Sequence, residues 1–432
     1  MNNPFLWPDT TTLQAGRLWI GGCDTTALAE EYGTPLYLFD ETTLRATMRA
    51  YRKAFAAAYP AECRIHYASK AFLNTAVAQI AAQESLGLDV VSAAELLTAQ
   101  RAGLAAEHVH VHGNAKTADE LLRALEYGVG AIVIDNRDEI ARLAALTASR
   151  STVQAVLLRI APNVTGDTHA HISTGATDAK FGLPLDTLDA AVEQVLAAPG
   201  LRLIGLHAHI GSQLFEPEDL AEAVAVLVAQ AARIRARYGV VIGEISPGGG
   251  LGVPYTADTP PADLGRYART LAATLVEQCR VHGLTPLPRL TIEPGRSIVA
   301  RAGVALYRVV ARKPGYYLHI DGGMADNIRP ALYGARYTAL LANRAADPAG
   351  PPIHVAGRYC ESGDVLLRDA PLGHAEPGDL LAVATSGAYT LSMASNYNLT
   401  PRPAVLLLTN GVARLIQRRE TEADLLARDL WL

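Results

Sequence analysis

Residues 64–70 read Arg-Ile-His-Tyr-Ala-Ser-Lys, a short and mostly apolar run that ends in a lysine. Apolar residues then recur at three- and four-residue spacing over Thr75–Glu84, and the next apolar run is Leu88–Ser92. Short apolar runs predict buried strands, whereas the three- and four-residue spacing predicts an amphipathic helix. The stretch therefore predicts a strand–helix–strand unit of the kind that builds a parallel sheet.

The same rhythm continues on both sides of this unit. Eight strands are predicted, at Arg64–Ser69, Leu88–Ser92, His108–His112, Ala131–Asp135, Val153–Ile160, Leu203–Ile210, Glu244–Ser246 and Leu290–Ile292. Most of them are followed by a helical pattern, and together they span roughly 250 residues, the usual size of a (β/α)8 barrel. An open doubly wound sheet is the alternative, but an early Gly-x-Gly-x-x-Gly turn is missing from the sequence.

The pattern changes after about residue 296, where segments become short, β-rich and punctuated by Gly and Pro. A short strand-like run also occurs near the N-terminus, at Arg17–Ile20. We therefore predict an α/β chain of two domains. Residues 36–290 form the barrel, and residues 1–35 and 291–432 form a β-rich domain that completes the active site.

Composition excludes several classes of protein. Of the 432 residues, 50% are hydrophobic and 19% are charged, and the formal net charge is −5. A nucleic-acid-binding domain would usually be basic, and a membrane span would need about 18 consecutive apolar residues, which the sequence does not contain. The N-terminus lacks the features of a signal peptide, and the four cysteines are widely scattered. We expect a cytoplasmic enzyme whose partners include neither nucleic acid nor membrane.

Reactive side chains follow the predicted strands, which is where a barrel places its active site. They are Lys70 after the first strand, Asp89 in the second with Glu95 after it, His207 and His209 with Ser212 at the sixth, Gly248, Gly249 and Gly250 after the seventh, and Glu293, Gly295 and Arg296 after the eighth. Pyridoxal 5'-phosphate needs an amine for its aldehyde, an acid beside its pyridine nitrogen and N–H groups for its phosphate. Lys70, Glu293 and the three glycines meet these needs, while His209 can stack on the ring and Ser212 can donate to the phosphate.

Each of these features has an ordinary structural reading when it is taken alone. A lysine after a strand is usually a solvated charge, and a run of glycines is usually a turn. His108, His110 and His112 alternate and so share one face of a strand, but no carboxylate or fourth ligand follows at useful spacing, so we predict no metal site. The joint placement at successive strand ends favours the cofactor site.

The ordered set of motifs resembles the fold type III pyridoxal-phosphate decarboxylases, and within them the diaminopimelate decarboxylases. The matching segments cover nearly the whole chain: Tyr67–Ala71, Gly87–Ser92, His207–Gln213, Pro247–Gly252, Glu293–Val299, Arg329–Tyr333, Cys360–Asp364 and Gly387–Tyr389. The chain departs from the usual pattern at Phe72-Leu73-Asn74 and at Gly323 and Ala325. None of these positions coincides with a candidate site residue.

The resemblance implies the roles of the later residues. Cys360 would protonate the substrate carbon after carbon dioxide leaves, and it would come from the other subunit of a homodimer. Tyr389 would contact phosphate and substrate. Arg296, Arg329 and Tyr333 would hold the distal carboxylate, and Glu361 the distal ammonium. Two arginines and one glutamate suit a zwitterionic group, which implies decarboxylation of meso-2,6-diaminopimelate to L-lysine, the last step of lysine biosynthesis.

Two other functions remain as alternatives. One is a different enzyme on the same barrel, either an alanine-type racemase or a decarboxylase of ornithine, lysine, arginine or carboxynorspermidine type. The other is a protein that binds the cofactor without catalysis. The polar stretch Asn163–Lys180 is long for a loop in a compact domain, and we expect it to act as a lid.

Overall fold

The computed structural model describes residues 3–148, 150, 152–164 and 180–432. The expected lid therefore lies almost entirely outside the described residues. The chain divides into two compact units. One comprises Met48–Gly252 and Ala262–Ser297, and the other comprises Met1–Thr47, Val253–Pro261 and Ile298–Leu432. No helix in the described part of the chain is both long enough and apolar enough to cross a membrane.

The first unit is a closed parallel barrel, as the sequence predicts. Its eight strands pair in the order β9-β11-β12-β13-β5-β6-β7-β8, and pairing of β8 with β9 closes the ring. Their bounds are β5 Cys63–Ala68, β6 Gly87–Val90, β7 Val109–Val111, β8 Ala131–Ile134, β9 Gln154–Ala161, β11 Leu201–His207, β12 Glu244–Gly248 and β13 Arg289–Ile292. The two-residue strand β10 (Leu183–Pro184) pairs with β9. All parallel strands end at the same rim, so residues distant in sequence meet there.

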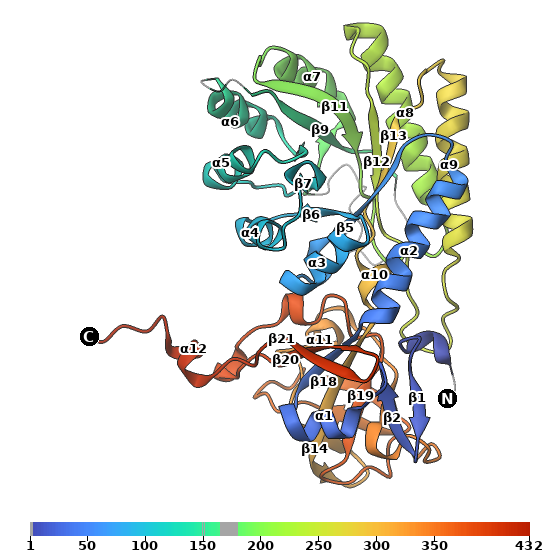
Figure 1. The fold of residues 1–432 in the computed structure, drawn as a ribbon, viewed down its shortest axis with the longest axis vertical. Helices are drawn as coiled ribbons and strands as arrows, with labels where there is room; N and C mark the ends of the chain where they lie inside the picture. Colours follow the sequence, from blue (N-terminus) through green and yellow to red (C-terminus); the bar gives the residue numbers. More distant parts are fainter. Residues whose placement is uncertain (1–2, 149, 151, 165–179) are drawn as a thin grey trace. The chain divides into compact units, whose positions relative to one another are not determined.

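Helices follow most of these strands (Figure 1). They are α3 Thr75–Gln83, α4 Ala93–Arg101, α5 Ala118–Tyr127, α6 Arg137–Thr147, α7 Leu188–Leu196, α8 Glu218–Tyr238, α9 Leu264–Val281 and α10 Arg296–Val299, and one more helix, α2 Glu41–Ala58, precedes β5. Polar N-caps fix where several begin: Ser92 accepts from the Glu95 N–H, and Thr117 forms a capping box with Glu120. These caps set the length of the turns that carry residues of the rim.

The second unit is built on antiparallel and mixed sheets. Its strands are β1 Thr12–Gln14, β2 Arg17–Ile20, β3 Cys23–Asp24, β4 Leu36–Asp40, β14 Gly303–Lys313, β15 Tyr317–Ile320, β16 Ala339–Leu341, β17 Ile353–Ala356, β18 Val365–Ala370, β19 Leu380–Val383, β20 Ala404–Thr409 and β21 Val412–Gln417. Its helices are α1 Thr25–Tyr32, α11 Arg329–Tyr333 and α12 Glu422–Leu426. A core that includes Trp7, Leu38, Leu306 and Leu406 packs between these elements.

The strand β4 lies in the second unit, whereas the sequence-based domain boundary assigns residues from 36 onward to the barrel. β4 pairs antiparallel with β14 and parallel with β20, and all five of its residues are buried. A strand that is buried on both faces carries no alternation to show which sheet it joins.

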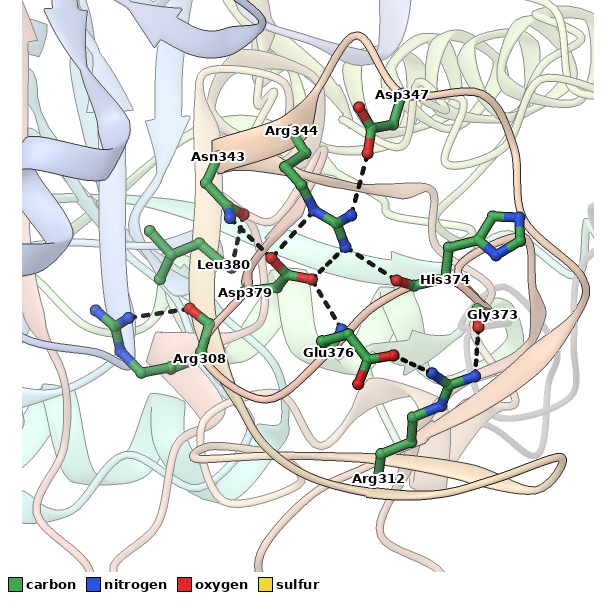
Figure 2. A network of polar contacts seen from close by, with 11 residues as sticks. Arg308, Arg312, Asn343, Arg344, Asp347, Gly373, His374, Glu376, Asp379 and Leu380 are labelled. Carbon is green, nitrogen blue, oxygen red and sulfur yellow. Dashed lines mark hydrogen bonds and ion pairs between the residues drawn. The ribbon is translucent and has the colours of Figure 1, made fainter.

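A polar network around Asp379 fixes the turn before β19 (Figure 2). The Asp379 carboxylate accepts hydrogen bonds from Asn343 Nδ2 at 2.8 Å, from the Arg344 guanidinium and from the Glu376 N–H at 2.8 Å. Nearby, Arg312 pairs with the Glu376 carboxylate. Because Asp379 is 8% exposed, the cost of burying its charge is offset by these donors.

Candidate active site

Lys70 lies in a short 3-10 helix, Ser69–Ala71, directly after β5, and its side chain is exposed at the end of the barrel. The half-buried His209, two residues past β11, is close enough for the charge of Lys70 to lower its pKa. Burial is the larger cause of that lowered pKa, so His209 is neutral at physiological pH. Burial raises the pKa of the Glu95 carboxyl. The same lysine charge lowers this pKa by less, so it is raised on balance. The charge of the amine therefore acts on a flat neutral ring and on a carboxyl.

Glu293 follows β13 and is held by residues from neighbouring strands. Its Oε2 is 3.0 Å from His207 Nε2, its Oε1 accepts a 2.6 Å hydrogen bond from Ser246 Oγ, and His112 Nε2 is 3.8 Å away. Burial by itself raises the pKa of Glu293, and Asp89 adds to this, but His207 and His112 hold the pKa below its ordinary value. Glu293 is therefore a carboxylate, the state needed to keep a pyridine nitrogen protonated.

Asp89 on β6 contacts two histidines from the strands on either side. Its Oδ1 is 3.4 Å from His66 Nδ1 and 3.3 Å from His112 Nε2. Burial alone would raise the pKa of Asp89, but these histidines lower it well below its ordinary range. The converse holds for His112. Burial lowers the pKa of His112, but Asp89 and Glu293 raise it by more, so that the pKa is raised on balance. His112 thus lies between the Asp89 and Glu293 carboxylates, at 3.3 and 3.8 Å.

The three glycines after β12 pack too closely for side chains. A Cβ at Gly249 would lie 2.1 Å from the Glu293 carbonyl oxygen, and one at Gly248 would lie 2.6 Å from His209 Nδ1. Gly248 and Gly250 also have φ values of +80° and +119°, which L side chains rarely adopt. The Gly248 N–H donates to Ser246 Oγ at 3.2 Å, and the Gly249 N–H points at His209 Nδ1 at 3.4 Å. The loop thus brings bare backbone to the rim beside Glu293 and His209.

Ser212 and Arg296 meet beside this loop. The Arg296 guanidinium donates to Ser212 Oγ from Nε at 3.2 Å and from Nη2 at 3.0 Å, and Arg296 is 8% exposed. Gly295 precedes it, and a Cβ there would lie 3.1 Å from the Cβ atoms of Ala68 and Ala71. The eighth strand therefore turns tightly against the segment that carries Lys70. The structure brings together all of the site residues that the sequence predicts for the barrel.

The remaining predicted site residues, Arg329, Tyr333, Cys360, Glu361 and Tyr389, belong to the second unit. Arg329 begins α11 and Tyr333 ends it. Arg329 is 6% exposed, its guanidinium lies 4.5 Å from the ring centre of Tyr255 and 5.5 Å from that of Tyr337, and Nη1 donates to the Tyr337 hydroxyl. Burial lowers the pKa of Arg329, but the two tyrosines more than offset this. No carboxylate among the described residues pairs with this buried cation.

Cys360 and Glu361 lie in the exposed loop between β17 and β18. The Cys360 N–H donates to Asn398 Oδ1 at 3.0 Å, and the Tyr397 hydroxyl donates to its carbonyl at 3.2 Å. The buried Asp364 accepts from the N–H groups of Met324 and Tyr359 at 2.7 and 2.9 Å and so fixes the base of the loop.

Tyr389, after β19, has a φ of +57°, an uncommon conformation for a bulky residue. Strained backbone of this kind is concentrated at functional sites.

Three residues of the barrel site have no role in the sequence-based prediction: Arg159, Ser246 and His112. Arg159 on β9 is buried and stacks 4.4 Å from the ring centre of Phe181, and its charge acts on Glu293 and Asp135. An arginine inside the apolar run Val156–Ala161 is the signal that identifies it. Ser246 and His112 are ordinary residues in the sequence, and only the strand register shows that they reach Glu293.

Two groups of buried residues have the ligand types of a metal site: His66, Asp89 and His110, and His112, His207 and Glu293. In both groups the carboxylate comes from a different strand from the histidines, so spacing along the chain could not reveal it. The predicted absence of a metal stays a prediction.

The pyridoxal-dependent decarboxylase model, which describes a pyridoxal-binding domain, matches residues 41–300. The chain belongs to this family. A diaminopimelate decarboxylase of Bacillus subtilis is 44% identical over 99% of this chain and 98% of its own length. That of Actinosynnema pretiosum is 46% identical over 98% and 95%. A diaminopimelate decarboxylase from M. jannaschii, solved with L-lysine, superposes with a TM-score of 0.90 at 33% identity over 98% of both chains.

The residues of this decarboxylase fit pyridoxal phosphate on structural grounds. Lys70 supplies an exposed amine, and Glu293 supplies a buried carboxylate that stays ionised. The rim between β11 and β13 consists of glycine backbone that a Cβ would block. Arg296 adds a cation beside Ser212. An amine, an acid and an anion-binding surface are the three features that this cofactor requires.

Proposed function

We propose that this decarboxylase converts meso-2,6-diaminopimelate to L-lysine and carbon dioxide with pyridoxal phosphate as cofactor. The observation that carries the choice of substrate is the buried guanidinium of Arg329, which has tyrosines but no described carboxylate around it. A buried cation without an anion is costly unless a ligand supplies the anion. Diaminopimelate has a distal carboxylate, whereas ornithine and lysine do not. The names of the relatives also support diaminopimelate over the basic amino acids.

The cofactor is held by the barrel residues in this proposal. Lys70 provides the amine that retains it, His209 lies against one face of its ring, and Glu293 keeps its nitrogen protonated. The phosphate is placed at Gly248–Gly250 with Ser212, Gly295, Arg296 and Tyr389, and Asp89 acts on Glu293 through His112. When bound, the cofactor accepts the electron pair that is left when carbon dioxide departs.

The substrate is oriented by its far end. Arg329 forms a fork that suits two hydrogen bonds to the distal carboxylate. Arg296 and Tyr333 also bind this carboxylate in the proposal, and Glu361 pairs with the distal ammonium. Fixing this end aligns the bond to the departing carboxylate.

Cys360 Sγ then delivers a proton to the α-carbon, so that a C–H bond replaces the C–C bond, and the thiolate recovers its proton from solvent.

The exposed Cys360 loop suits delivery to a second copy of the chain, and we propose a homodimer with shared active sites. Light scattering should then give twice the chain mass of 45.8 kDa. Mixing Lys70→Ala with Cys360→Ala should raise activity above that of either variant alone, because one hybrid site then has both residues. Activity no higher than that of Cys360→Ala alone would refute the shared site.

Carbon dioxide release by the cofactor-loaded protein tests the reaction. Diaminopimelate, lysine, ornithine and arginine should be compared, and release from diaminopimelate alone, with L-lysine as product, is expected. Lys70→Ala should remove turnover, and Cys360→Ala should lower it while the cofactor stays bound. Release from ornithine or lysine instead would mean that Arg329 and Glu361 have other roles.

We further propose that the two compact units are the two domains of the chain, and that the enzyme is cytoplasmic. Limited proteolysis between the units and fractionation of cells that express the protein test these points. Whether Asn163–Lys180 closes over the site is tested by shortening that loop and measuring turnover.

A further inference from the structure

The barrel unit contains a cavity that the proposed reaction does not use. Its volume is about 560 Å³, within the range of small-molecule sites, and it lies between α2 and the first residues of β5 and β6. Gly87 and His108, which line it, are the first residue of β6 and the residue before β7. The strands begin here, whereas Lys70 and Glu293 follow strand ends.

The lining of this cavity is strongly basic. It includes Arg49, Arg52, Lys53 and Arg64 together with His66 and His108, and none of the described residues that line it has a carboxylate. Two carboxylates outside the lining neutralise part of this charge. Glu84 pairs with Arg49 at 2.7 Å, and Glu62 pairs with Arg64 at 2.8 Å but is shared with Arg289.

Arg52 and Lys53 provide the excess charge. Arg52 donates to the Glu84 backbone carbonyl at 3.1 Å, which leaves its charge uncompensated. Lys53 is exposed on the next residue of α2. The wall also contains the buried apolar residues Phe55, Tyr59 and Ile65.

His66 is a second and independent sign of a ligand site. It is 1% exposed and lines the cavity. Its Nδ1 lies 3.4 Å from Asp89 Oδ1, whereas its Nε2 has no hydrogen-bond partner among the described residues. A buried imidazole without such a partner is costly. Gly87 makes room for it, since a Cβ there would lie 2.7 Å from His66 Nε2.

We propose that this cavity binds a small organic polyanion with two or more phosphate or carboxylate charges, held by Arg52, Lys53 and His66. The cations attract the charges, and the apolar wall accepts the carbon part of the ligand.

The site is connected to the candidate active site through His66. From its Nδ1 the path runs 3.4 Å to Asp89, 3.3 Å from Asp89 to His112, and 3.8 Å from His112 to Glu293. An anion bound beside His66 adds a negative charge at the first residue of this path. The polyanion therefore acts as an effector of the carboxylate that holds the cofactor. This coupling rests on the proposed function, whereas binding in the cavity does not.

Calorimetry on the cofactor-loaded protein tests the binding, with pyrophosphate as the phosphate probe and citrate as the carboxylate probe. Wild type should bind at least one of them with a sub-millimolar Kd at low ionic strength. The double variant Arg52→Gln/Lys53→Gln should weaken binding at least tenfold. The matched control is Arg101→Gln/Arg202→Gln, which removes two exposed cations of the same unit and should bind as wild type does. No binding of either probe, or equal loss in both double variants, overturns the site.

The absorption spectrum of the bound cofactor tests the coupling without turnover. Adding the probe that binds should shift the pH at which the spectrum changes, and His66→Gln should remove the shift. Binding with an unchanged spectrum overturns the effector role. Inactivity towards diaminopimelate alongside intact binding would instead count against the proposed function.

Discussion

Replacing Arg329 by glutamine tests the choice of substrate most directly. The guanidinium is 6% exposed between Tyr255 and Tyr337, and in the proposed complex it gives two charge-assisted hydrogen bonds to the distal carboxylate. Each such bond contributes about 1.5–3 kcal/mol, so the lower bound for two is about 3 kcal/mol. At 1.36 kcal/mol for each factor of ten, Arg329→Gln should lower kcat/KM for diaminopimelate about 150-fold. Arg329→Lys keeps the charge but loses the fork of two N–H donors, so its kcat/KM should lie between those of wild type and Arg329→Gln.

Three measurements separate recognition from damage to the fold. Inhibition by L-lysine should weaken by a similar factor, because the carboxylate that stays on the product is the distal carboxylate that Arg329 binds. The thermal unfolding midpoint should be compared, because Arg329 packs on two rings. The matched control is Arg336→Gln, an exposed arginine that pairs with Asp258. A fall in kcat/KM below threefold, or unchanged inhibition by L-lysine, would refute the reasoning.

Three further predictions concern buried groups. Lys116→Met should lower the free energy of unfolding by about 3–5 kcal/mol in a urea titration, because the 2.8 Å ion pair of Lys116 with Glu139 is almost fully buried. Adding Glu139→Leu should recover at least half of the lost free energy. No recovery would show that the ion pair is not the cause. Gly249→Ala should raise the Kd of pyridoxal phosphate at least tenfold by fluorescence titration, since its Cβ would lie 2.1 Å from the Glu293 carbonyl oxygen; unchanged affinity would place the phosphate elsewhere. Asp379→Asn should cost about 1–3 kcal/mol at pH 7 by denaturant unfolding and much less near pH 3. Burial raises the pKa of Asp379, but donors that include Arg344 lower this pKa on balance. The stability that Asp379 contributes is therefore present above the pKa of the unfolded state and is lost as the pH falls through the pKa of the folded state. An equal cost at both pH values would contradict this.

Most of the barrel could be predicted because each of its strands carries a local signal. The eight predicted strands all appear within a few residues of their expected positions, since apolar runs and helical spacing are properties of neighbouring residues. The polar residues at strand ends are equally local, and the rule that parallel strands share one rim brings Lys70, His209 and Glu293 together. The sequence therefore determines the fold class, and it gives the candidate residues for the cofactor.

Tertiary structure decides which residue acts on which. The path from His66 through Asp89 and His112 to Glu293 depends on the register of strands far apart in the chain. Likewise, Arg329 could have been a surface ion-pair partner, and only packing places it between two tyrosines without a described carboxylate. β4 joined the second sheet for the same kind of reason, since its pairing with β20 links residues more than 360 positions apart. Local patterns fix what each segment can form, whereas charge, burial and pairing between distant segments exist only once the chain has folded.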